Sequence, residues 1–374
     1  MKVLHVLQGT VGGTVEFINL LTQQLNKRGY INIVASPRYS NLRDKCLAQG
    51  MDWLELDMCR EISLIKDTKS ILKLIKIIKD EKCDILHAHS SKAGAIGRVA
   101  AWLSGIPCIY TPHGWSFNMK VSNLKKMFYR VIERLLAHIT SVITCISQHE
   151  LESAISAGIS PKMLTKIDNG MNLAKYDIKM SRDVLRGRLN IPEDKIVIGM
   201  VARITEQKDP FFFLDIASEM RSRVKDSYFI LVGDGDLREQ FEERIASSED
   251  LRDRVLVIGW VDEPELYIKC FDVAILTSKW EGFGLVLVEY MASKIPIVAT
   301  NVDGIPYVIR DGYSGLLAES GNVVQFSDKI CKLLHDKSLA DILVSNGYKA
   351  AHGKFSIQRT AEMYDQVYRK IQKK

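Results

Sequence analysis

The sequence predicts an α/β protein with two parallel β-sheets, each covered by helices. Three observations lead to this prediction. The chain has 374 residues, which suits two domains of roughly 150–200 residues each. Short apolar runs rich in Val and Ile alternate with helix-length amphipathic segments, as in repeated βαβ units. Ten such runs fall into two groups of five, which favours two sheets over one.

Each group of expected strands forms one Rossmann-like domain. The first group is Val3–Leu7, Ile31–Ala35, Ile85–Ala88, Cys108–Thr111 and Val142–Cys145. The second group is Ile196–Val201, Tyr228–Val232, Arg254–Ile258, Val273–Leu276 and Ile297–Thr300. Apolar residues recur at helical spacing between the strands, for example in Pro210–Arg223. The turn signal Asp168-Asn169-Gly170 gives an N-terminal domain of residues 1–168 and a second domain from residue 169.

Composition and charge exclude several classes of protein. Hydrophobic residues make up 47% of the chain and charged residues 26%, which argues against disorder, collagen and coiled coil. The seven cysteines are scattered without a CxxC pair, so we expect reduced thiols in a cytoplasm and no structural zinc site. Residues 1–180 hold 24 basic and 15 acidic side chains, whereas the rest holds 27 and 30. The basic half could face nucleic acid, a membrane surface or an anionic substrate.

The stretch from Ser278 to Glu289 carries the strongest motif, because it follows an expected strand and opens a helix. Glycines at 282 and 284 let the backbone approach a ligand. The free amides of Gly284, Leu285 and Val286 at the helix N-terminus would bind a diphosphate. Glu281 and Glu289 could accept hydrogen bonds from ligand hydroxyls. A simple βα turn with a capping acid has the same local pattern.

A second stretch, Val201 to Lys208, delivers two cations to the end of another expected strand. Arg203 and Lys208 could neutralise phosphates there. Taken alone, they could equally be two solvated surface cations.

Together, these motifs resemble the retaining glycosyltransferases of family 4, which have the GT-B fold. The resemblance rests on Trp-Glu-Gly-Phe-Gly with a Glu-x7-Glu spacing, preceded by Arg-x4-Lys, and it covers nearly the whole chain. Leu231-Val232-Gly233-Asp234-Gly235, Gly12-Gly13-Thr14-Val15-Glu16 and His113-Gly114 are similar to further motifs of that family. One position departs from it, since Tyr307 follows Pro306 where an acidic residue is common.

The resemblance implies two Rossmann-like domains that face each other across a cleft. It implies an acceptor-binding domain (1–168), a donor-binding domain (169–356) and a C-terminal helix (357–374) that packs back on the first domain. It also implies roles for single residues. Arg203 and Lys208 would hold the donor diphosphate, Glu289 the ribose, and Glu281 with the amides around Phe283 and Gly284 the transferred sugar. Gly12 and Gly13 would admit the diphosphate and the acceptor, and His113 would lie beside the reacting sugar.

These residue types suit glycosyl transfer, because cations that contact the departing diphosphate lower the barrier selectively. The family retains anomeric configuration through attack assisted by the leaving phosphate, so we assign no protein nucleophile. We expect no metal and no cofactor besides the nucleoside diphosphate sugar, most simply a UDP-sugar. Asp234-Gly235-Asp236 spells the DxD of a metal-dependent class, but its place in a glycine turn favours a turn and cap.

The segments around His89–Gly94 and Tyr110–Phe117 resemble a bacterial subgroup that builds capsule, exopolysaccharide or O-antigen. Acceptors of that subgroup are sugars on a polyprenyl diphosphate, so Ser91 and Lys92 would lie near the acceptor. A solvated helix residue is the other interpretation of Lys92. The resemblance implies a cytoplasmic enzyme held peripherally at the anionic inner-membrane surface, with no nucleic-acid partner.

Two basic amphipathic segments bear on membrane binding, Ser63–Lys82 and Asn118–His138. Either could lie on anionic lipid or simply cover the sheet with a solvated basic face. Two other functions stay open from the sequence. A non-hydrolysing UDP-sugar epimerase shares the fold but needs no acceptor, and a polyanion-binding module would explain the basic half.

Overall fold

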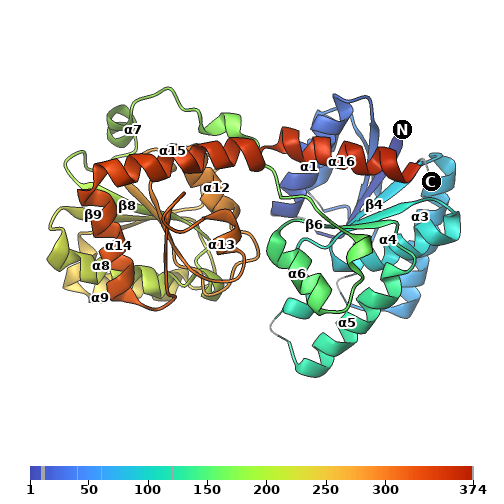
Figure 1. Cartoon of the computed structure of the whole chain (residues 1–374), viewed down its shortest axis with the longest axis horizontal. Helices are drawn as coiled ribbons and strands as arrows, with labels where there is room; N and C mark the ends of the chain where they lie inside the picture. The colour runs from blue at the N-terminus through green and yellow to red at the C-terminus, as the bar shows by residue number, and fades with distance from the viewer. Residues whose placement is uncertain (10–12, 40, 60, 120, 373–374) are drawn as a thin grey trace. The chain divides into compact units, whose positions relative to one another are not determined.

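The chain folds into two α/β units, shown in Figure 1. The computed structural model describes residues 1–9, 13–39, 41–59, 61–119 and 121–372. The first unit comprises Met1–Asn172 and Ser356–Lys374, and the second comprises Leu173–Phe355.

In the described residues of the first unit, seven parallel strands pair in the order β3-β2-β1-β4-β5-β6-β7. The strands are β1 (Lys2–Leu7), β2 (Ile31–Ser36), β3 (Asp52–Glu55), β4 (Ile85–His89), β5 (Cys108–Thr111), β6 (Val142–Cys145) and β7 (Leu164–Lys166). The helices are α1 (Gly13–Asn26), α2 (Asn41–Ala48), α3 (Leu64–Asp80), α4 (Ser91–Ser104), α5 (Asn123–Ala137), α6 (Gln148–Ser156) and α16 (Ile357–Gln372). Short 3-10 turns occupy Ser116–Asn118 and Pro161–Met163.

Both faces of this sheet are covered, because successive residues of a strand point to opposite sides. Leu4 and Val6 of β1 pack into one core cluster with residues of α3 and α4. Val3 and Leu7 pack into a second cluster with residues of α1 and α16. The apolar stripe of α16 contributes Ile357, Ala361, Tyr364, Tyr368 and Ile371 to that cluster.

The second unit contains a parallel sheet of six strands in the order β10-β9-β8-β11-β12-β13, and all of its residues are described. The strands are β8 (Ile196–Val201), β9 (Ser227–Val232), β10 (Val255–Gly259), β11 (Val273–Leu276), β12 (Ile297–Thr300) and β13 (Leu316–Ala318). The helices are α7 (Arg182–Arg188), α8 (Pro210–Arg223), α9 (Arg238–Ser247), α10 (Glu249–Arg252), α11 (Pro264–Ile268), α12 (Leu285–Ala292), α13 (Ile305–Val308), α14 (Val323–His335) and α15 (Lys337–Lys354). Leu173–Tyr176 and Glu206–Lys208 form 3-10 turns.

The sequence predicted ten strands, and this number is wrong, since β3, β7 and β13 were missed. All three are short strands at the edges of their sheets. The sequences of β3 and β7 lack a continuous apolar run, and the apolar run of β13 has only three residues. In β3 and β7 most residues are only half-buried.

The observed division of the chain falls at 172/173 and 355/356, whereas the sequence placed it at 168/169 and 356/357. Residues after Asp168 stay with the first unit because they contact the start of α16. Met171 pairs with Ser356 in an isolated bridge. A Cβ atom at Gly170 would lie 2.3 Å from Oγ1 of Thr360, so only glycine allows this approach.

A buried ion pair joins α4 to α5 in the first unit. Nη2 of Arg98 lies 2.9 Å from Oε2 of Glu133, and both side chains are almost fully buried. The guanidinium also stacks on the ring of Tyr110, with Cζ 4.0 Å from the centroid, and the Tyr110 hydroxyl donates to Glu133 at 3.2 Å. Since neither charge reaches water, each one depends on the other.

Glu133→Gln therefore leaves a buried cation without its anion, and we expect it to lower the free energy of unfolding by about 3–5 kcal/mol. The exposed pair of Arg28 and Glu362 provides the control, and Glu362→Gln is expected to cost no more than about 1 kcal/mol. Urea unfolding followed by circular dichroism measures both. Equal costs for the two variants would contradict this account of the pair.

Candidate functional site

In the second unit, an ion pair joins the loop after β8 to the loop after β11. The ammonium of Lys208 contacts Oε2 of Glu281, and the two side chains are only 13% and 11% exposed. The Ser278 hydroxyl donates to the same carboxylate oxygen at 3.4 Å. Two predicted site residues are thus brought together at the carboxyl edge of the sheet, where parallel sheets bind ligands.

Gln207 joins the same two loops through its backbone carbonyl and its side-chain amide. Its carbonyl accepts from the Lys279 amide at 2.8 Å, and its side-chain amide donates to the Trp280 carbonyl at 3.1 Å. The guanidinium of Arg203 donates to Oε1 of Gln207 at 3.4 Å and is exposed. Arg203 therefore presents a cation at the same edge as Lys208.

Close backbone contacts explain two of the glycines in the motifs. A Cβ atom at Gly304 would lie 2.1 Å from the carbonyl oxygen of Gly282, so the loop after β12 could not approach the motif otherwise. The Gly304 amide donates to the Glu281 carbonyl at 2.8 Å. At Gly233, φ is +142°, and a Cβ atom would lie 2.0 Å from the carbonyl oxygen of Ala202. These glycines fix the backbone beside Glu281 and Arg203.

The helix α12 begins directly after the motif. Gly284 adopts φ +79° at the N-cap, and Leu285 and Val286 form the first turn, where backbone amides have no intrahelical acceptor. The side chain of Phe283 is buried against Phe355, with ring centroids 5.5 Å apart, so only its backbone is available to a ligand. The N-terminus of α12 can thus offer amides to an anion.

Glu289 lies one turn further along α12 and is half-buried. Burial raises the pKa of its carboxyl group, while the charge of Lys175 and a hydrogen bond from Tyr176 oppose this shift. A carboxylate held in this way gains from hydrogen bonds that a ligand hydroxyl would donate.

In the first unit, His113 follows β5 in a left-handed conformation, with φ +53°. A non-glycine residue with this φ costs free energy, and such strain clusters at functional sites. The imidazole is half-buried against Phe17, with ring centroids 5.2 Å apart, and burial lowers its pKa to about 3. His113 is therefore a neutral imidazole near pH 7.

Ser90 follows the neighbouring strand β4 and is also left-handed, with φ +72°. A hollow of about 380 Å³ opens beside it and is lined by Ser91 and Lys92 at the start of α4 and by Tyr129, Ile132 and Glu133 of α5, among others. Lys92 is not a freely solvated cation, because its side chain is only 11% exposed and its Nζ lies 2.5 Å from Oδ2 of Asp67. The two residues predicted at the acceptor site thus line one hollow.

Of the two glycines predicted at the first loop, Gly13 opens α1 and is exposed, whereas Gly12 lies outside the described residues. In β4, His87 and His89 point to the same side of the sheet, as two potential metal ligands would. His5 of β1 lies beside them, and one ring nitrogen of each of the three histidines lies within 4.8 Å of the other two. The ring nitrogens of the three histidines already bond Asn32, Tyr368, Thr111, His113 and one another.

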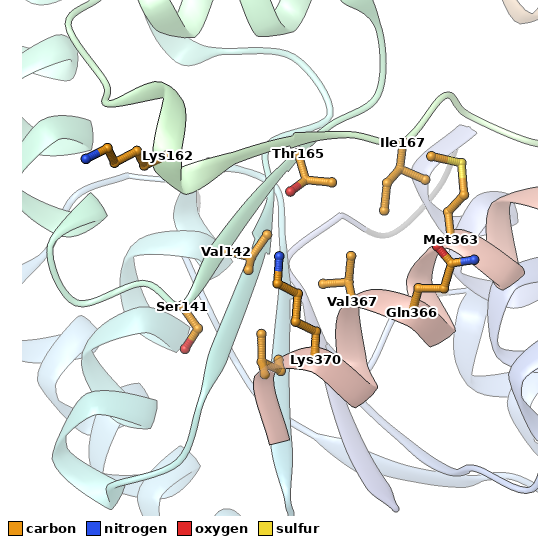
Figure 2. Close-up of a pocket in the computed structure, with 10 residues that line it drawn as sticks. Ser141, Val142, Lys162, Thr165, Ile167, Met363, Gln366, Val367 and Lys370 are labelled. Carbon is orange, nitrogen blue, oxygen red and sulfur yellow. The ribbon is translucent and has the colours of Figure 1, made fainter. Parts of the chain in front are cut away.

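Figure 2 shows a larger hollow, of about 510 Å³, that holds none of the predicted site residues. Its lining includes Ser141 and Val142, where β6 begins, and Gln366 and Lys370 of α16. The lining runs along β6 and β7, from Ser141 to Ile167, on the side of the sheet that α16 covers, and not over the motif loops that follow the strands. We therefore assign no site to it.

Comparison with known proteins identifies the family. A family model described as Glycosyl transferases group 1 matches residues 181–350, and one described as Glycosyltransferase Family 4 matches residues 11–175. The UDP-Gal:alpha-D-GlcNAc-diphosphoundecaprenol alpha-1,3-galactosyltransferase of Escherichia coli is 31% identical over 98% of this chain and 96% of its own. The capsular polysaccharide biosynthesis glycosyltransferase CapM of Staphylococcus aureus is 26% identical over 84% and 83%.

Among solved structures, HepE of Anabaena in complex with UDP superimposes with a TM-score of 0.86 at 20% identity, covering 98% of this chain and 99% of that one. The chain therefore belongs to glycosyltransferase family 4 and is a glycosyltransferase with the GT-B fold. The predicted family and the predicted pair of parallel-sheet domains are confirmed. The roles of single residues stay predictions.

Sequence reasoning missed Glu150, which supports the residue next to His113. Its carboxylate accepts from the Gly114 amide at 2.5 Å and from the Ile146 amide at 3.0 Å. Burial raises its pKa to about 7, although these two hydrogen bonds lower it. Only the three-dimensional contact reveals this role, because a Glu in the first turn of a helix is common.

The folded protein binds a proton at Glu150 more readily than the unfolded chain, whose carboxyl group titrates near pH 4.5. The stability that this difference contributes, up to about 3 kcal/mol, is present in full below about pH 4.5 and is lost as the pH rises through about 7. Carboxyl ¹³C NMR should show Glu150 titrating near pH 7. The difference in unfolding free energy between wild type and Glu150→Gln should change across that range. A midpoint near 4.5 would contradict the assignment.

Proposed function

We propose that the protein is a retaining hexosyltransferase that moves a sugar from a nucleoside diphosphate sugar, in the first instance a UDP-sugar, to a polyprenyl-diphosphate-linked sugar in surface-polysaccharide synthesis. The observation that carries the donor half is the Lys208–Glu281 pair next to the N-terminus of α12. The activity named for the Escherichia coli relative supports the acceptor class, and the UDP complex of a similar fold supports the donor class.

The donor diphosphate would bind to Arg203, Lys208 and the amides of Gly284, Leu285 and Val286. A diphosphate offers Lys208 a stronger partner than Glu281, so the pair would separate as the donor binds. The released Glu281 carboxylate could then accept hydrogen bonds from sugar hydroxyls, and Glu289 could accept from the ribose. Donor binding and preparation of the sugar site would be one event.

Charge develops on the diphosphate as the glycosidic bond breaks, and the fixed cations and amides stabilise that charge more than the ground state. The leaving phosphate would take the proton of the attacking acceptor hydroxyl on the same face, which retains the configuration. The scheme assigns the protein no nucleophile and uses no metal, because protein cations neutralise the diphosphate.

The acceptor would bind to the first unit, in the hollow lined by Ser91 and Lys92. The N-terminus of α4 meets that hollow and would attract the acceptor diphosphate. The helix α5 lines the same hollow through Tyr129 and Ile132. His113 would contact the sugar substrate.

The opposite side of α5 supports binding to a membrane surface. Leu124, Met127, Phe128, Val131 and Leu135 recur at helical spacing and are 46–71% exposed. Lys125, Lys126 and Arg130 lie among them in the sequence. An exposed apolar stripe with basic neighbours suits the interface of an anionic bilayer better than nucleic acid. Among the described helices, none is long and apolar enough to cross a membrane.

We thus propose a cytoplasmic enzyme that docks on the inner membrane through α5, where its lipid-linked acceptor lies. A screen of UDP- and GDP-sugars with polyprenyl-diphosphate-linked sugars, with and without EDTA, tests the function. The proposal expects transfer with a retained anomeric centre that EDTA does not alter. Conversion of a sugar nucleotide without acceptor would instead indicate an epimerase.

Loss of one cation tests the donor site. Lys208→Ala should weaken UDP binding roughly 10- to 100-fold, the effect of one charge-assisted hydrogen bond. Lys279→Ala is the matched control, since Lys279 belongs to the motif loop but is exposed, with its ammonium 3.5 Å from Asp209. Isothermal titration with UDP measures both variants. Equal losses would show that only the general charge of this edge matters.

A second substitution tests the membrane surface. Phe128→Asp should weaken binding to vesicles of anionic phospholipid by roughly tenfold or more, because a buried Phe contributes about 1.5–3 kcal/mol. Leu72→Asp on α3 is the control, since Leu72 is 60% exposed on the other basic helix. Vesicle sedimentation at physiological salt compares the two. Unchanged binding of Phe128→Asp would exclude α5 as the docking surface.

A further inference from the structure

A row of hydrogen-bonded side chains runs from His113 into the core of the first unit. Nε2 of His113 lies 3.1 Å from Nδ1 of His89, and Nε2 of His89 lies 3.1 Å from Nδ1 of His5. Nε2 of His5 lies 3.0 Å from Oδ1 of Asn32. His5, His89 and Asn32 are buried, and the proposed function gives none of them a role.

The direction of these hydrogen bonds is set at the Asn32 end. Nδ2 of Asn32 lies 3.4 Å from the backbone carbonyl of Thr22 and 2.6 Å from Oδ1 of Asn26. A backbone carbonyl only accepts, so the amide nitrogen must face Thr22 and the amide oxygen must face His5. The proton between Asn32 and His5 therefore belongs to Nε2 of His5.

A neutral imidazole has one N–H and one bare nitrogen. The direction of the hydrogen bond at Asn32 therefore fixes the direction of every other hydrogen bond in the row. The bare Nδ1 of His5 accepts from Nε2–H of His89, and the bare Nδ1 of His89 accepts from Nε2–H of His113. The last bare nitrogen is Nδ1 of His113. No described residue donates a hydrogen bond to it.

The row is built to hold neutral imidazoles. It ends in an amide, which does not stabilise an imidazolium as a carboxylate would. Burial lowers the pKa of His5 to about 4 and that of His89 well below its usual value. An imidazolium at His5 or His89 has two N–H groups and would place a donor against the N–H of the next histidine, so that His113 would have to change tautomer.

We propose that Asn32 sets the tautomer of His113 through His5 and His89, so that His113 offers Nδ1 to the sugar substrate as a hydrogen-bond acceptor. This inference rests on the proposed function, in which a sugar lies beside His113. A bare nitrogen recognises a hydroxyl by accepting its proton, and it disfavours a group that only accepts. Asn32, His5 and His89 are positioning residues, because they act through His113.

NMR of the full chain labelled with ¹⁵N-histidine tests the tautomer directly. Long-range ¹H–¹⁵N correlation distinguishes protonated from bare ring nitrogens, and His113→Gln assigns the signals of His113. At neutral pH we expect Nε2 protonated and Nδ1 bare. A proton on Nδ1, or on both nitrogens, would overturn the inference whatever the activity of the enzyme.

Two matched variants test whether the row sets this state. His5→Phe removes the acceptor of His89 and should leave His113 as a mixture of tautomers. His87→Phe is the control, since His87 lies opposite His5 on β4, is equally buried, and bonds Tyr368 and Thr111 outside the row. Equal responses would overturn the inference. If His5→Phe does not fold, Asn32→Leu removes the acceptor of His5 and makes the same comparison.

Transfer assays add a measurement that distinguishes positioning of His113 from a general structural effect of the substitutions. His5→Phe should lower kcat/KM roughly three- to tenfold, the contribution of one ordinary hydrogen bond, with UDP affinity unchanged. His87→Phe should leave both values unchanged. The absence of any transfer by the wild-type protein would overturn the proposed function and leave the NMR result standing.

Discussion

A polar side chain inside a parallel sheet covered on both faces must find its partners within the protein, because water reaches neither face. This constraint governs the first unit. His5, His87 and His89 lie on the side of the sheet that α1 and α16 cover, and they satisfy one another with Asn32, Thr111 and Tyr368. The Arg98–Glu133 pair answers the same requirement on the side of α4 and α5.

The constraint also explains why each candidate site lies where the strands end. There the chain leaves the sheet, and the backbone adopts left-handed turns at Ser90 and His113 in one unit and at Asp209 and Gly284 in the other. In the second unit, Lys208 and Glu281 meet at this edge and satisfy each other. In the proposed function, the donor diphosphate would replace Glu281 as the partner of Lys208, and this exchange would free the carboxylate for the sugar.

The sequence predicted the two sheets, ten of their strands and the motif loops, because these features depend on local apolar runs and glycine turns. It placed Lys208 and Glu281 in one site through resemblance alone, since 73 residues separate them. It could not reveal Glu150 or the row behind His113, because those contacts join separate strands and helices. His5 looks like an ordinary strand residue until β1 pairs with β4 and brings it opposite His87. The short edge strands were missed for the related reason that they carry too little apolar sequence.

In the proposed function, the Lys208–Glu281 pair marks the site of the donor diphosphate. A crystal structure of the protein with UDP tests it most directly. We expect the diphosphate to lie against Arg203, Lys208 and the first amides of α12, and the ribose to lie at Glu289. Glu281 should then be separated from Lys208. A diphosphate bound elsewhere, with the Lys208–Glu281 pair intact, would contradict the account.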